Sequence, residues 1–530
     1  MKIRFFLFSA ILIFSSVRAQ QTGNYFEWGR QMEMIAGVME QVLNNYVEEP
    51  NPEKMGADAI KGMLRRTDKY TRFYDEQQMF DQRLRQSGKA SGIGVRIRAN
   101  DQGLLIRDVM PGTPARQAGL MPGDVIIEID GTSLRELSAR QKDKLIKGKP
   151  GTEVRLKIRR DDKTFETAIR RQILEQDAVP YFGMLDGETG YIRLRKFTRS
   201  ASREVQDALV ELKNKGAKRI VLDLRNNPGG LLSQAINTVN LFIPSGKLVV
   251  ETKGRLEKYN KKYFTKKSPV DEEMPLVVLV NRGSASASEI VSGTLQDYDR
   301  ARIIGDTTYG KGLVQRFFPV KYGTYVKITI SRYYLPSGRL IQKRDYWHRD
   351  AQGNITAYKR DTTAFYTEKG RRVYEHGGIA PDVYIPSDTL WPVVKHFINK
   401  DHVFDFFVRY IRTHERPASP EALDERDLAE AFIRYARDHD MKAGAPWLQK
   451  MESAFQKART QIKNKETLKS LENELQMARA RLQNQLKSPE IKTQLGTEIK
   501  KLLLRYYFGD GVMDEYLIKH SPVKKYILKK

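Results

Sequence analysis

The sequence predicts an α/β core that is preceded by an inserted unit of short strands and flanked at both ends by helical segments. Three observations support this fold class. Apolar strand-like runs alternate with helical runs over residues 181–386, which is typical of an α/β sheet that is at least partly parallel. Short strands separated by Gly and Pro turns occupy residues 90–175. Near both ends, apolar residues recur at helical spacing.

Residues 1–19 have the features of an export signal. Lys2 and Arg4 flank the apolar run from Phe5 to Phe14, and small residues surround a cut site after Ala19. The run is short for a membrane-spanning helix, and an uncleaved anchor is the alternative interpretation. Because the chain has no cysteine for lipid attachment, we expect a soluble exported protein that is periplasmic or associated with the cell envelope.

Residues 25–85 predict a small helical element. Its first helix carries an apolar stripe at steps of three and four, and a second helical segment follows over residues 52–63. The stripe consists of Trp28, Met32, Ile35, Met39, Val42 and Tyr46. It serves either to pack onto the main domain or to form a dimer contact, and the residues alone do not decide between these roles.

Residues 90–175 predict a compact unit of short strands. A helix opens at Pro111-Gly112-Thr113-Pro114-Ala115, and Pro122-Gly123 marks a turn. The predicted strands are Ile93–Arg98, Leu104–Val109, Val125–Ile129, Val154–Arg159 and Phe165–Ile169.

Residues 181–386 predict the α/β core. Helices are expected over Ser200–Lys215, from Leu231 and from Ser286. The predicted strands are Gly190–Leu194, Ile220–Leu224, Leu276–Val280, Ile303-Ile304 and Tyr325–Ser331. Residues 387–530 are helical and charged, with long amphipathic segments over Leu423–Arg437 and Trp447–Leu486. Most charges of this last region are expected on solvated helix faces, with a coiled-coil partner interface as the alternative.

The chain is strongly basic. Lys and Arg exceed Asp and Glu by 92 − 65 = 27, and such a charge attracts nucleic acid, anionic lipid or acidic protein. The basic residues are spread along the sequence, and no nucleic-acid reading module accompanies them. We therefore do not expect nucleic acid as the main partner.

The stretch Asn281–Ile290 carries a candidate nucleophile. Ser284, Ser286 and Ser288 lie among small residues that follow the strand Leu276–Val280 and open a helix. A helix N-terminus directs N–H groups and partial positive charge at a developing oxyanion, and the N–H of Ala287 is a natural first donor to it. Local context alone does not choose among the three serines.

Lys311 is the candidate base. All seven histidines follow Ser286 in the sequence, the first being His348, so a Ser-Lys pair is simpler than a Ser-His-Asp triad. A lysine accepts a proton only when neutral, which requires burial to lower its pKa. Gln315 offers an amide that orients an amine without adding charge.

The motifs around these residues resemble the carboxyl-terminal processing peptidases, which are serine endopeptidases that contain a PDZ domain and use a Ser-Lys dyad. The resemblance spans residues 25–386 and rests most specifically on Asn281–Ile290 and Tyr309–Gln315. In this family the middle serine of the SASAS run is the nucleophile and the lysine follows 25 positions later, which selects Ser286 and Lys311. Gln315 matches the glutamine that follows the lysine by four residues in this family. Glu289 and Asp297 also match the family pattern, with roles that stay open.

The resemblance also implies a core similar to the crotonase and Clp protease fold. It implies a second oxyanion donor among the backbone N–H groups of Pro228-Gly229-Gly230, where an ordinary turn is the alternative interpretation. The strand-rich unit resembles a PDZ domain through Gly92, Ile93, Gly94 and Val95, and through Ala118–Asp124. In PDZ domains the first motif captures a terminal carboxylate while the peptide adds as a strand. A unit that serves only as a spacer is the alternative.

We therefore expect an exported serine endopeptidase with no cofactor, no metal ion and no ATP requirement. Its PDZ domain would select protein or peptide substrates by their free C-termini. An adaptor or regulatory protein and a second copy of the chain, in a homo-oligomer, are the other expected partners. The competing interpretations are a catalytically inactive PDZ scaffold or binding protein, and a protein that adheres to anionic polymers through its basic tail.

Overall fold

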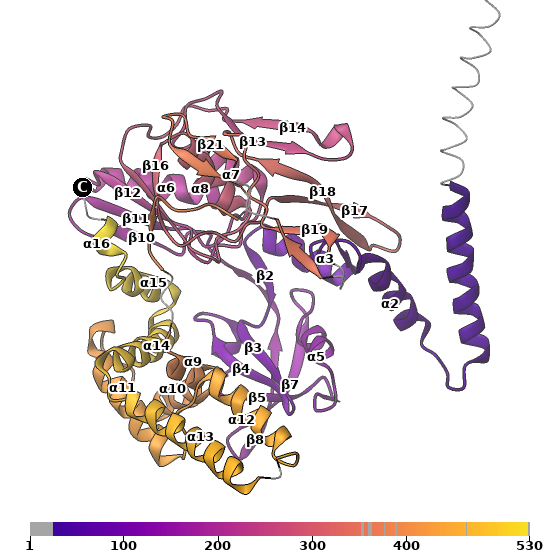
Figure 1. Ribbon diagram of the computed structural model, residues 1–530, viewed down its shortest axis with the longest axis vertical. Helices are drawn as coiled ribbons and strands as arrows, with labels where there is room; N and C mark the ends of the chain where they lie inside the picture. The colour runs from indigo at the N-terminus through magenta and orange to yellow at the C-terminus, as the bar shows by residue number, and fades with distance from the viewer. Residues whose placement is uncertain are drawn as a thin grey trace, which may run out of the picture. The chain divides into compact units, whose positions relative to one another are not determined.

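The computed structural model describes residues 25–350, 354–358, 363–375, 377–386, 390–462 and 464–527. The predicted export signal at residues 1–19 lies outside these ranges. The chain divides into two compact units, with boundaries after Asp75, after Val314 and within the long strand β18 (Tyr325–Tyr334), which is labelled in Figure 1. The first unit contains the chain up to Asp75 together with Gln315–Thr329, and the second contains Glu76–Val314 and Ile330–Lys530.

The first unit combines helices with a small antiparallel sheet. Residues 25–45 are helical, and α2 (Pro52–Leu64) begins with Pro52 after Asn51, whose side chain accepts a hydrogen bond from the N–H of Lys54. β1 (Arg72–Tyr74) pairs with the first half of β18, where Arg72 faces Lys327 and Tyr74 faces Tyr325. β17 (Leu313–Pro319) also pairs with β18.

The centre of the second unit is a six-stranded sheet in the order β10-β11-β12-β15-β16-β23. The strands are β10 (Tyr181–Met184), β11 (Thr189–Arg193), β12 (Arg219–Asp223), β15 (Leu276–Val280), β16 (Ala301–Gly305) and β23 (Val383–Tyr384). β10 is antiparallel to its neighbour, and all other pairs are parallel. The carboxyl ends of the parallel strands therefore lie at one edge, where ligands and substrates bind in α/β sheets.

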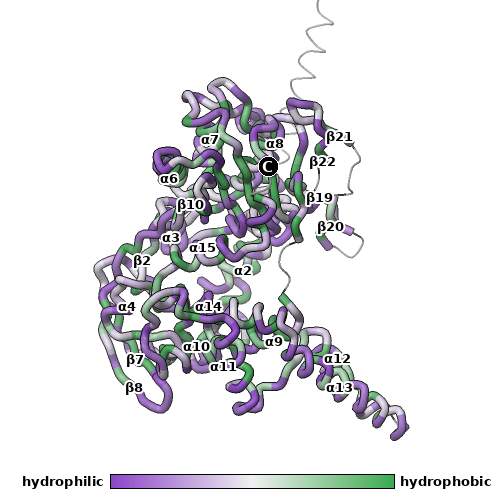
Figure 2. The backbone as a smooth tube through the Cα atoms, turned by 90° about the vertical axis from the view of Figure 1, so that its left-hand side faces the viewer, coloured by the Kyte–Doolittle hydropathy of each residue, from purple (hydrophilic) through white to green (hydrophobic). Residues whose placement is uncertain are grey.

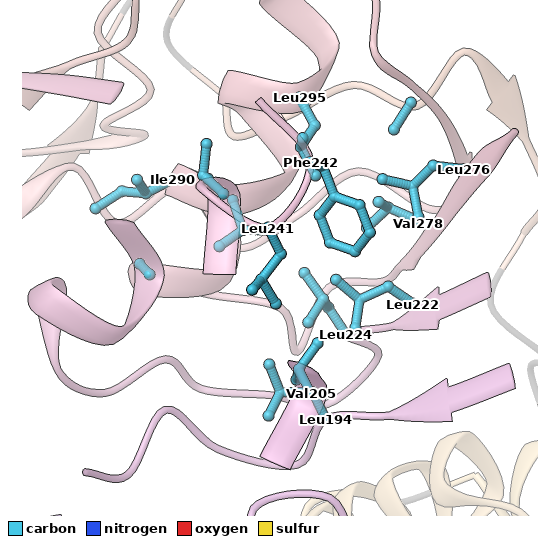
Figure 3. Packing of buried hydrophobic residues seen from close by; sticks show 14 of the residues in the cluster. Leu194, Val205, Leu222, Leu224, Leu241, Phe242, Leu276, Val278, Ile290 and Leu295 are labelled. Carbon is cyan, nitrogen blue, oxygen red and sulfur yellow. The ribbon is translucent and has the colours of Figure 1, made fainter. Parts of the chain in front are cut away.

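One face of this sheet is covered by α6 (Ala201–Asn214), α7 (Leu232–Val239) and α8 (Ala287–Asp297). Figure 3 shows part of this core: Val205 of α6 and Ile290 and Leu295 of α8 belong to the same buried cluster as Leu222 and Val278 of the sheet. These side chains are almost fully buried. The helix predicted over Ser200–Lys215 is thus present as α6, because its apolar residues recur at the spacing of one helix face.

The opposite face is covered by the end of the chain. Val221, Leu279 and Ile304 alternate in sequence with the residues that face the helices, and they pack against Ile518 and Val523. A parallel sheet is buried on both faces, so this contact completes the core. The elements involved are α15 (Asp510–Lys519) and α16 (Lys524–Ile527).

The strand-rich unit between α3 (Glu76–Gln86) and the core is an antiparallel sheet in the order β3-β4-β5-β7-β8. β6 pairs with β5, and a separate ladder joins β2 to β9. Its elements are β2 (Lys89–Gly92), β3 (Val95–Asn100), β4 (Gly103–Val109), α4 (Pro114–Gln117), β5 (Val125–Ile129), β6 (Thr132–Ser133), α5 (Ala139–Ile146), β7 (Glu153–Arg160), β8 (Lys163–Arg170) and β9 (Gln172–Glu175). β3 lies at the edge of the sheet, beside α5.

The remaining strands of the second unit surround the core. β13 and β14 form a hairpin, and β13 pairs with the second half of β18 through Thr252 and Tyr333. Their bounds, with those of the short ladders, are β13 (Leu248–Lys253), η1 (Glu257–Tyr259), β14 (Lys261–Phe264), β19 (Arg344–Arg349), β20 (Ile355–Ala357), β21 (Ala364–Tyr366) and β22 (Arg372–Tyr374).

The C-terminal helices have a core of their own, which includes Phe397, Phe407, Phe432 and Leu495. They are α9 (Pro392–Asn399), α10 (His402–Thr413), η2 (Pro420–Ala422), α11 (Glu425–Asp438), α12 (Pro446–Ala458), α13 (Lys465–Gln485) and α14 (Pro489–Phe508). The amphipathic segment predicted over Trp447–Leu486 is two helices, α12 and α13, along which hydrophilic and hydrophobic residues alternate (Figure 2). None of the helices in the described ranges is long and apolar enough to cross a membrane.

Candidate active site

Ser286 occupies a sharp turn between β15 and α8. Its φ of 57° and ψ of −113° lie outside the regions that L-residues ordinarily adopt, so the turn is strained. A strained strand-to-helix turn presents a nucleophile at the edge of a sheet, as in the nucleophile elbow of other hydrolases. The turn therefore places the Ser286 hydroxyl at the carboxyl edge of the parallel sheet.

The other two serines of the run have structural contacts. Ser284 Oγ donates a hydrogen bond to the carbonyl of Leu224 at 2.8 Å, and Ser288 Oγ donates to the carbonyl of Asn227 at 2.9 Å. Both side chains are fully buried, whereas Ser286 is partly exposed. A hydroxyl that is buried and bonded to a carbonyl cannot reach a substrate. Ser286 is thus the accessible serine of the three.

Lys311 lies in the loop between β16 and β17, flanked by two glycines whose surroundings are crowded. A Cβ added at Gly310, where φ is 81°, would lie 2.5 Å from Lys343 Cβ, and one at Gly312 would lie 3.1 Å from Gln342 N. Glycine is therefore required for the Lys311 segment to pass between its neighbours. The N–H of Gly312 is held by Gln342 Oε1 at 2.8 Å.

Glu289 joins the serine and lysine segments. Its Oε2 accepts hydrogen bonds from the N–H of Ser286 at 2.8 Å and from the N–H of Lys311 at 2.9 Å. Its Oε1 accepts from the Gly310 N–H and the Thr308 hydroxyl, each at 2.6 Å. Burial raises the pKa of the Glu289 carboxyl above its ordinary value, and the four hydrogen bonds oppose that rise. One buried carboxyl group thus fixes both backbone segments.

Tyr333 makes a second bridge from β18. Its hydroxyl lies 3.2 Å from the carbonyl of Ser286 and 2.5 Å from the carbonyl of Lys311, and its ring is buried. Tyr333 was not among the site residues that the sequence predicted. The bridge could not be predicted because it depends on the pairing of β18 with β13, far away in the sequence.

The Gly229 turn lies directly against the nucleophile. A Cβ at Gly229, where φ is 95°, would lie 2.6 Å from the Ala285 carbonyl and 2.9 Å from Ala287 N. The N–H of Gly229 donates to Asn227 Oδ1 at 2.9 Å. Within the described ranges, the N–H groups of Ala287 and Gly230 donate no intramolecular hydrogen bond. Gly229 therefore lets its turn lie close to the Ser286 segment. The N–H groups of Ala287 and Gly230 remain as the candidate donors to an oxyanion.

Asp297, at the end of α8, has a supporting position. Its Oδ1 pairs with the buried guanidinium of Arg339 at 2.7 Å, and its Oδ2 accepts from the Ser337 N–H at 3.0 Å. Burial raises the pKa of Asp297, and Arg339 opposes the rise.

Gln315 lies in β17 of the first unit, where its amide donates to Thr329 Oγ1 at 3.4 Å.

Gly92 ends β2, Val95 begins the edge strand β3, and Ile93 and Gly94 connect the two strands. Gly94 has a φ of 92°, and a Cβ there would overlap Thr113, so only glycine fits. Ser91 Oγ donates to the Gly148 carbonyl and Lys142 Nζ to the Asn100 carbonyl, both at 2.7 Å. These contacts hold α5 beside β3. The arrangement leaves one edge of β3 unpaired next to a helix, which is the geometry that accepts an added peptide strand.

Comparison with known proteins gives three family matches along the chain. Residues 188–349 match peptidase family S41, residues 91–170 match the PDZ domain, and residues 393–527 match a probable PDZ-protease C-terminal helical domain. The carboxy-terminal-processing protease of Bartonella bacilliformis is 35% identical over 350 residues, covering 64% of this chain and 80% of the relative.

Two further relatives extend the comparison. The carboxy-terminal processing protease CtpA of Bacillus subtilis is 32% identical over 356 residues, covering 65% of this chain and 75% of the relative. Among solved structures, a photosystem II D1 C-terminal processing protease is 26% identical, with a TM-score of 0.39, and the match covers 66% of this chain and 86% of that one.

Proposed function

The chain belongs to the carboxy-terminal processing proteases, serine peptidases of family S41, and from this premise we propose that Ser286 and Lys311 form its catalytic dyad. The observation that carries the proposal is the Glu289 carboxyl group, which accepts the N–H groups of both residues at 2.8 and 2.9 Å. Ser284 and Ser288 do not fit this role, because their buried hydroxyls donate hydrogen bonds to the carbonyls of Leu224 and Asn227.

In the proposed reaction, Ser286 Oγ attacks the carbonyl carbon of the scissile peptide bond while neutral Lys311 accepts the hydroxyl proton. The lysine then donates that proton to the leaving amine, and water hydrolyses the acyl-enzyme. The N–H groups of Ala287 and Gly230 bind the oxyanion, since the Gly229 N–H is occupied by Asn227. Gln315 orients the lysine amine, in keeping with its place four residues further along the chain.

Substrate selection is the second part of the proposal. The loop from Gly92 to Val95 captures the terminal carboxylate of a protein or peptide, and the peptide pairs with the free edge of β3. The unpaired edge and the glycine at Gly94 support this function over that of a spacer. We further propose that the chain is exported to the periplasm or cell envelope, that an adaptor or regulatory protein joins it, and that its core is similar to the crotonase and Clp protease fold.

The exposed stripe of the helix over residues 25–45 supports a homo-oligomer. Trp28, Met32 and Ile35 are 67, 45 and 44% exposed, although large apolar side chains are normally buried. A second copy of the same helix would cover them. Light scattering of the full chain should then give a mass above that of one chain, and a monomer at micromolar concentration would contradict it.

Substitution of the dyad tests the catalytic proposal. Ser286→Ala and Lys311→Ala should each lower kcat/KM for a tagged unfolded substrate by roughly a thousandfold or more. Ser288→Ala keeps the nucleophile and should retain measurable turnover, with lower thermal stability from the lost buried hydrogen bond. Retained cleavage by Ser286→Ala would refute the dyad, and an inactive wild-type chain that still bound peptide C-termini would favour the PDZ scaffold.

The pH profile gives an independent check. A protonated lysine cannot accept the Ser286 proton, so kcat/KM should fall as the pH is lowered. A rate that stays unchanged down to about pH 4 would contradict the lysine base.

A further inference from the structure

One hairpin of the second unit is densely basic. The basic hairpin, residues 247–267, consists of β13, η1 and β14 and contains eight Lys or Arg residues against two Glu residues. The cations are Lys247, Lys253, Arg255, Lys258, Lys261, Lys262, Lys266 and Lys267. From the sequence, the basic residues were expected to be spread along the chain, because the strands and connecting loop of this hairpin were not predicted. Figure 1 shows β13 and β14 running out together to a loop.

Most of these cations have no acidic partner. Lys247 pairs with Glu368 at 2.8 Å and Lys253 with Glu251 at 3.2 Å. The other six form no ion pair with any residue in the described part of the chain. All six are exposed. Glu257 is the acidic residue of the connecting segment, so the six cations leave a net positive charge there, which favours contact with an anionic surface.

The hairpin backbone is held firmly. Asn240 Oδ1 accepts hydrogen bonds from the N–H groups of Lys266 at 3.0 Å and Lys267 at 2.9 Å, and Thr252 Oγ1 donates to the Tyr259 carbonyl at 2.7 Å. Val250 is buried in the core, and Tyr263 packs against it. The charges are thus carried on a rigid support, so little ordering is needed when they meet a partner.

Apolar side chains lie among the unpaired cations. Leu256, in the connecting loop, is 38% exposed and Phe264, on β14, is 41% exposed. Aliphatic and aromatic side chains flanked by lysines are typical of segments that lie at a membrane interface, where the apolar groups enter the acyl region and the cations meet the headgroups.

We propose that the basic hairpin binds the surface of a bilayer that contains anionic phospholipid. Six unpaired cations match a surface of fixed negative charge, and Leu256 supplies an apolar contact that a nucleic-acid backbone cannot use. Each Lys or Arg near such a surface strengthens binding about fivefold, and salt screens the attraction. The hairpin would hold the protease at a membrane without a spanning segment from the described chain.

Vesicle co-sedimentation of the full-length protein tests the proposal. Vesicles of phosphatidylcholine alone are compared with vesicles that also contain phosphatidylglycerol. The variant Lys258→Gln/Lys261→Gln/Lys262→Gln should weaken binding to the anionic vesicles about a hundredfold. The matched control, Lys450→Gln/Lys457→Gln/Lys469→Gln, removes three exposed lysines of α12 and α13 that form no ion pair with a described residue, and it should bind as the wild type does. Leu256→Ser/Phe264→Ser should weaken binding at high salt as well.

The other outcomes overturn the proposal. Equal binding to both vesicle types, or none, removes the role of anionic lipid. An equal loss in the control variant shows that only total charge matters. Displacement by inorganic phosphate at matched ionic strength indicates a discrete phosphate site. If the hairpin variant binds vesicles normally but has a higher KM for acidic substrates or loses retention of nucleic acid, the partner is an acidic chain.

Unchanged cleavage of a neutral peptide is the folding control, because it excludes misfolding of the hairpin variant.

Discussion

At the scale of single residues, Glu289 is the group on which the site depends. Both of its oxygens accept two hydrogen bonds, and three of the four donors are backbone N–H groups of the catalytic loops. The sequence left the role of Glu289 open. A glutamate three residues after the N-cap of a helix is also common as part of a capping box, with no catalytic role. The contact with Lys311 gives it a positioning role.

Glu289→Gln should lower both activity and stability. An amide has one acceptor oxygen, so its NH2 group must face at least one backbone N–H donor whichever way it is turned. An unsatisfied buried donor costs about 1–3 kcal/mol, and we expect kcat to fall at least tenfold with KM changed less. Turnover kinetics and thermal melting measure these effects, with exposed Glu188→Gln as the control. Wild-type kcat in Glu289→Gln would show that the carboxyl group does not position the dyad.

At the scale of elements, the site is built where β15 enters α8 and where the turn after β12 approaches it. The two turns contain Ser286 and Asn226, each with a φ of 57°, and Gly229 with a φ of 95°. Asn281 ties them together, since its Oδ1 accepts from the Asn226 N–H at 2.8 Å. Strained turns at the carboxyl edge of a parallel sheet are stabilised here by the strands that precede them.

Gly229→Ala should abolish activity, because its Cβ would lie within 2.9 Å of Ala285 O and Ala287 N. Gly216→Ala is a matched control: its φ is 88°, but a Cβ there meets nothing within 4 Å. Both substitutions place an alanine at a positive φ, which should lower the folding stability by about 1 kcal/mol. Thermal melting measures this loss. Only Gly229→Ala should also lose turnover. Equal activity of the two variants would refute the close approach of the Gly229 turn.

At the scale of the whole chain, the C-terminal region belongs to the catalytic core. Ile518, which is fully buried, lies against Val221, Leu279 and Ile304 of the central sheet. Asp510 of the same helix links three parts of the second unit, since it pairs with Arg96 of the PDZ domain at 3.0 Å and with Arg195 of the core at 2.8 Å. The carboxyl-terminal residues therefore serve as the second layer of an α/β fold.

Ile518→Ala should destabilise the catalytic core by about 2–5 kcal/mol, because it leaves a cavity against the sheet. Leu471→Ala, at a position that is 41% exposed on α13, is the control and should cost less than about 1 kcal/mol. Urea unfolding followed by circular dichroism measures both. Equal midpoints for the two variants would mean that α15 does not contribute to the core.

The Asp510 junction makes stability depend on pH. Burial acts to raise the pKa of Asp510, but Arg195 and Arg96 outweigh it and lower the pKa from 3.8 to about 2. The paired carboxylate stabilises the folded state above about pH 4 by about 2 kcal/mol, and this contribution is lost as the pH falls from about 4 to 2. The difference in Tm between wild type and Asp510→Asn should therefore be largest near pH 7 and shrink below pH 4. A difference independent of pH would contradict the ion pairs.

Local patterns in the sequence were sufficient for the regular elements and for the candidate dyad. The period of apolar residues predicted α6, the continuous run Leu276–Val280 predicted β15, and the interval between Ser286 and Lys311 selected the proposed pair. These features depend on neighbours in the chain. The β13–β14 hairpin was missed because its polar residues lack a clear alternation, and the interruption between α12 and α13 because charged residues continue through it.

The sequence by itself determined which elements form and which side chains carry the chemistry, because propensity, periodicity and motif spacing act over short stretches of chain. The tertiary structure alone decided which groups meet. It placed the Glu289 carboxyl group between the serine and lysine segments, joined the Asn226 N–H to the Asn281 side chain, and packed Ile518 on the free face of the sheet. Such contacts join residues far apart in sequence, so they follow from the order of strands and from the burial of both sheet faces.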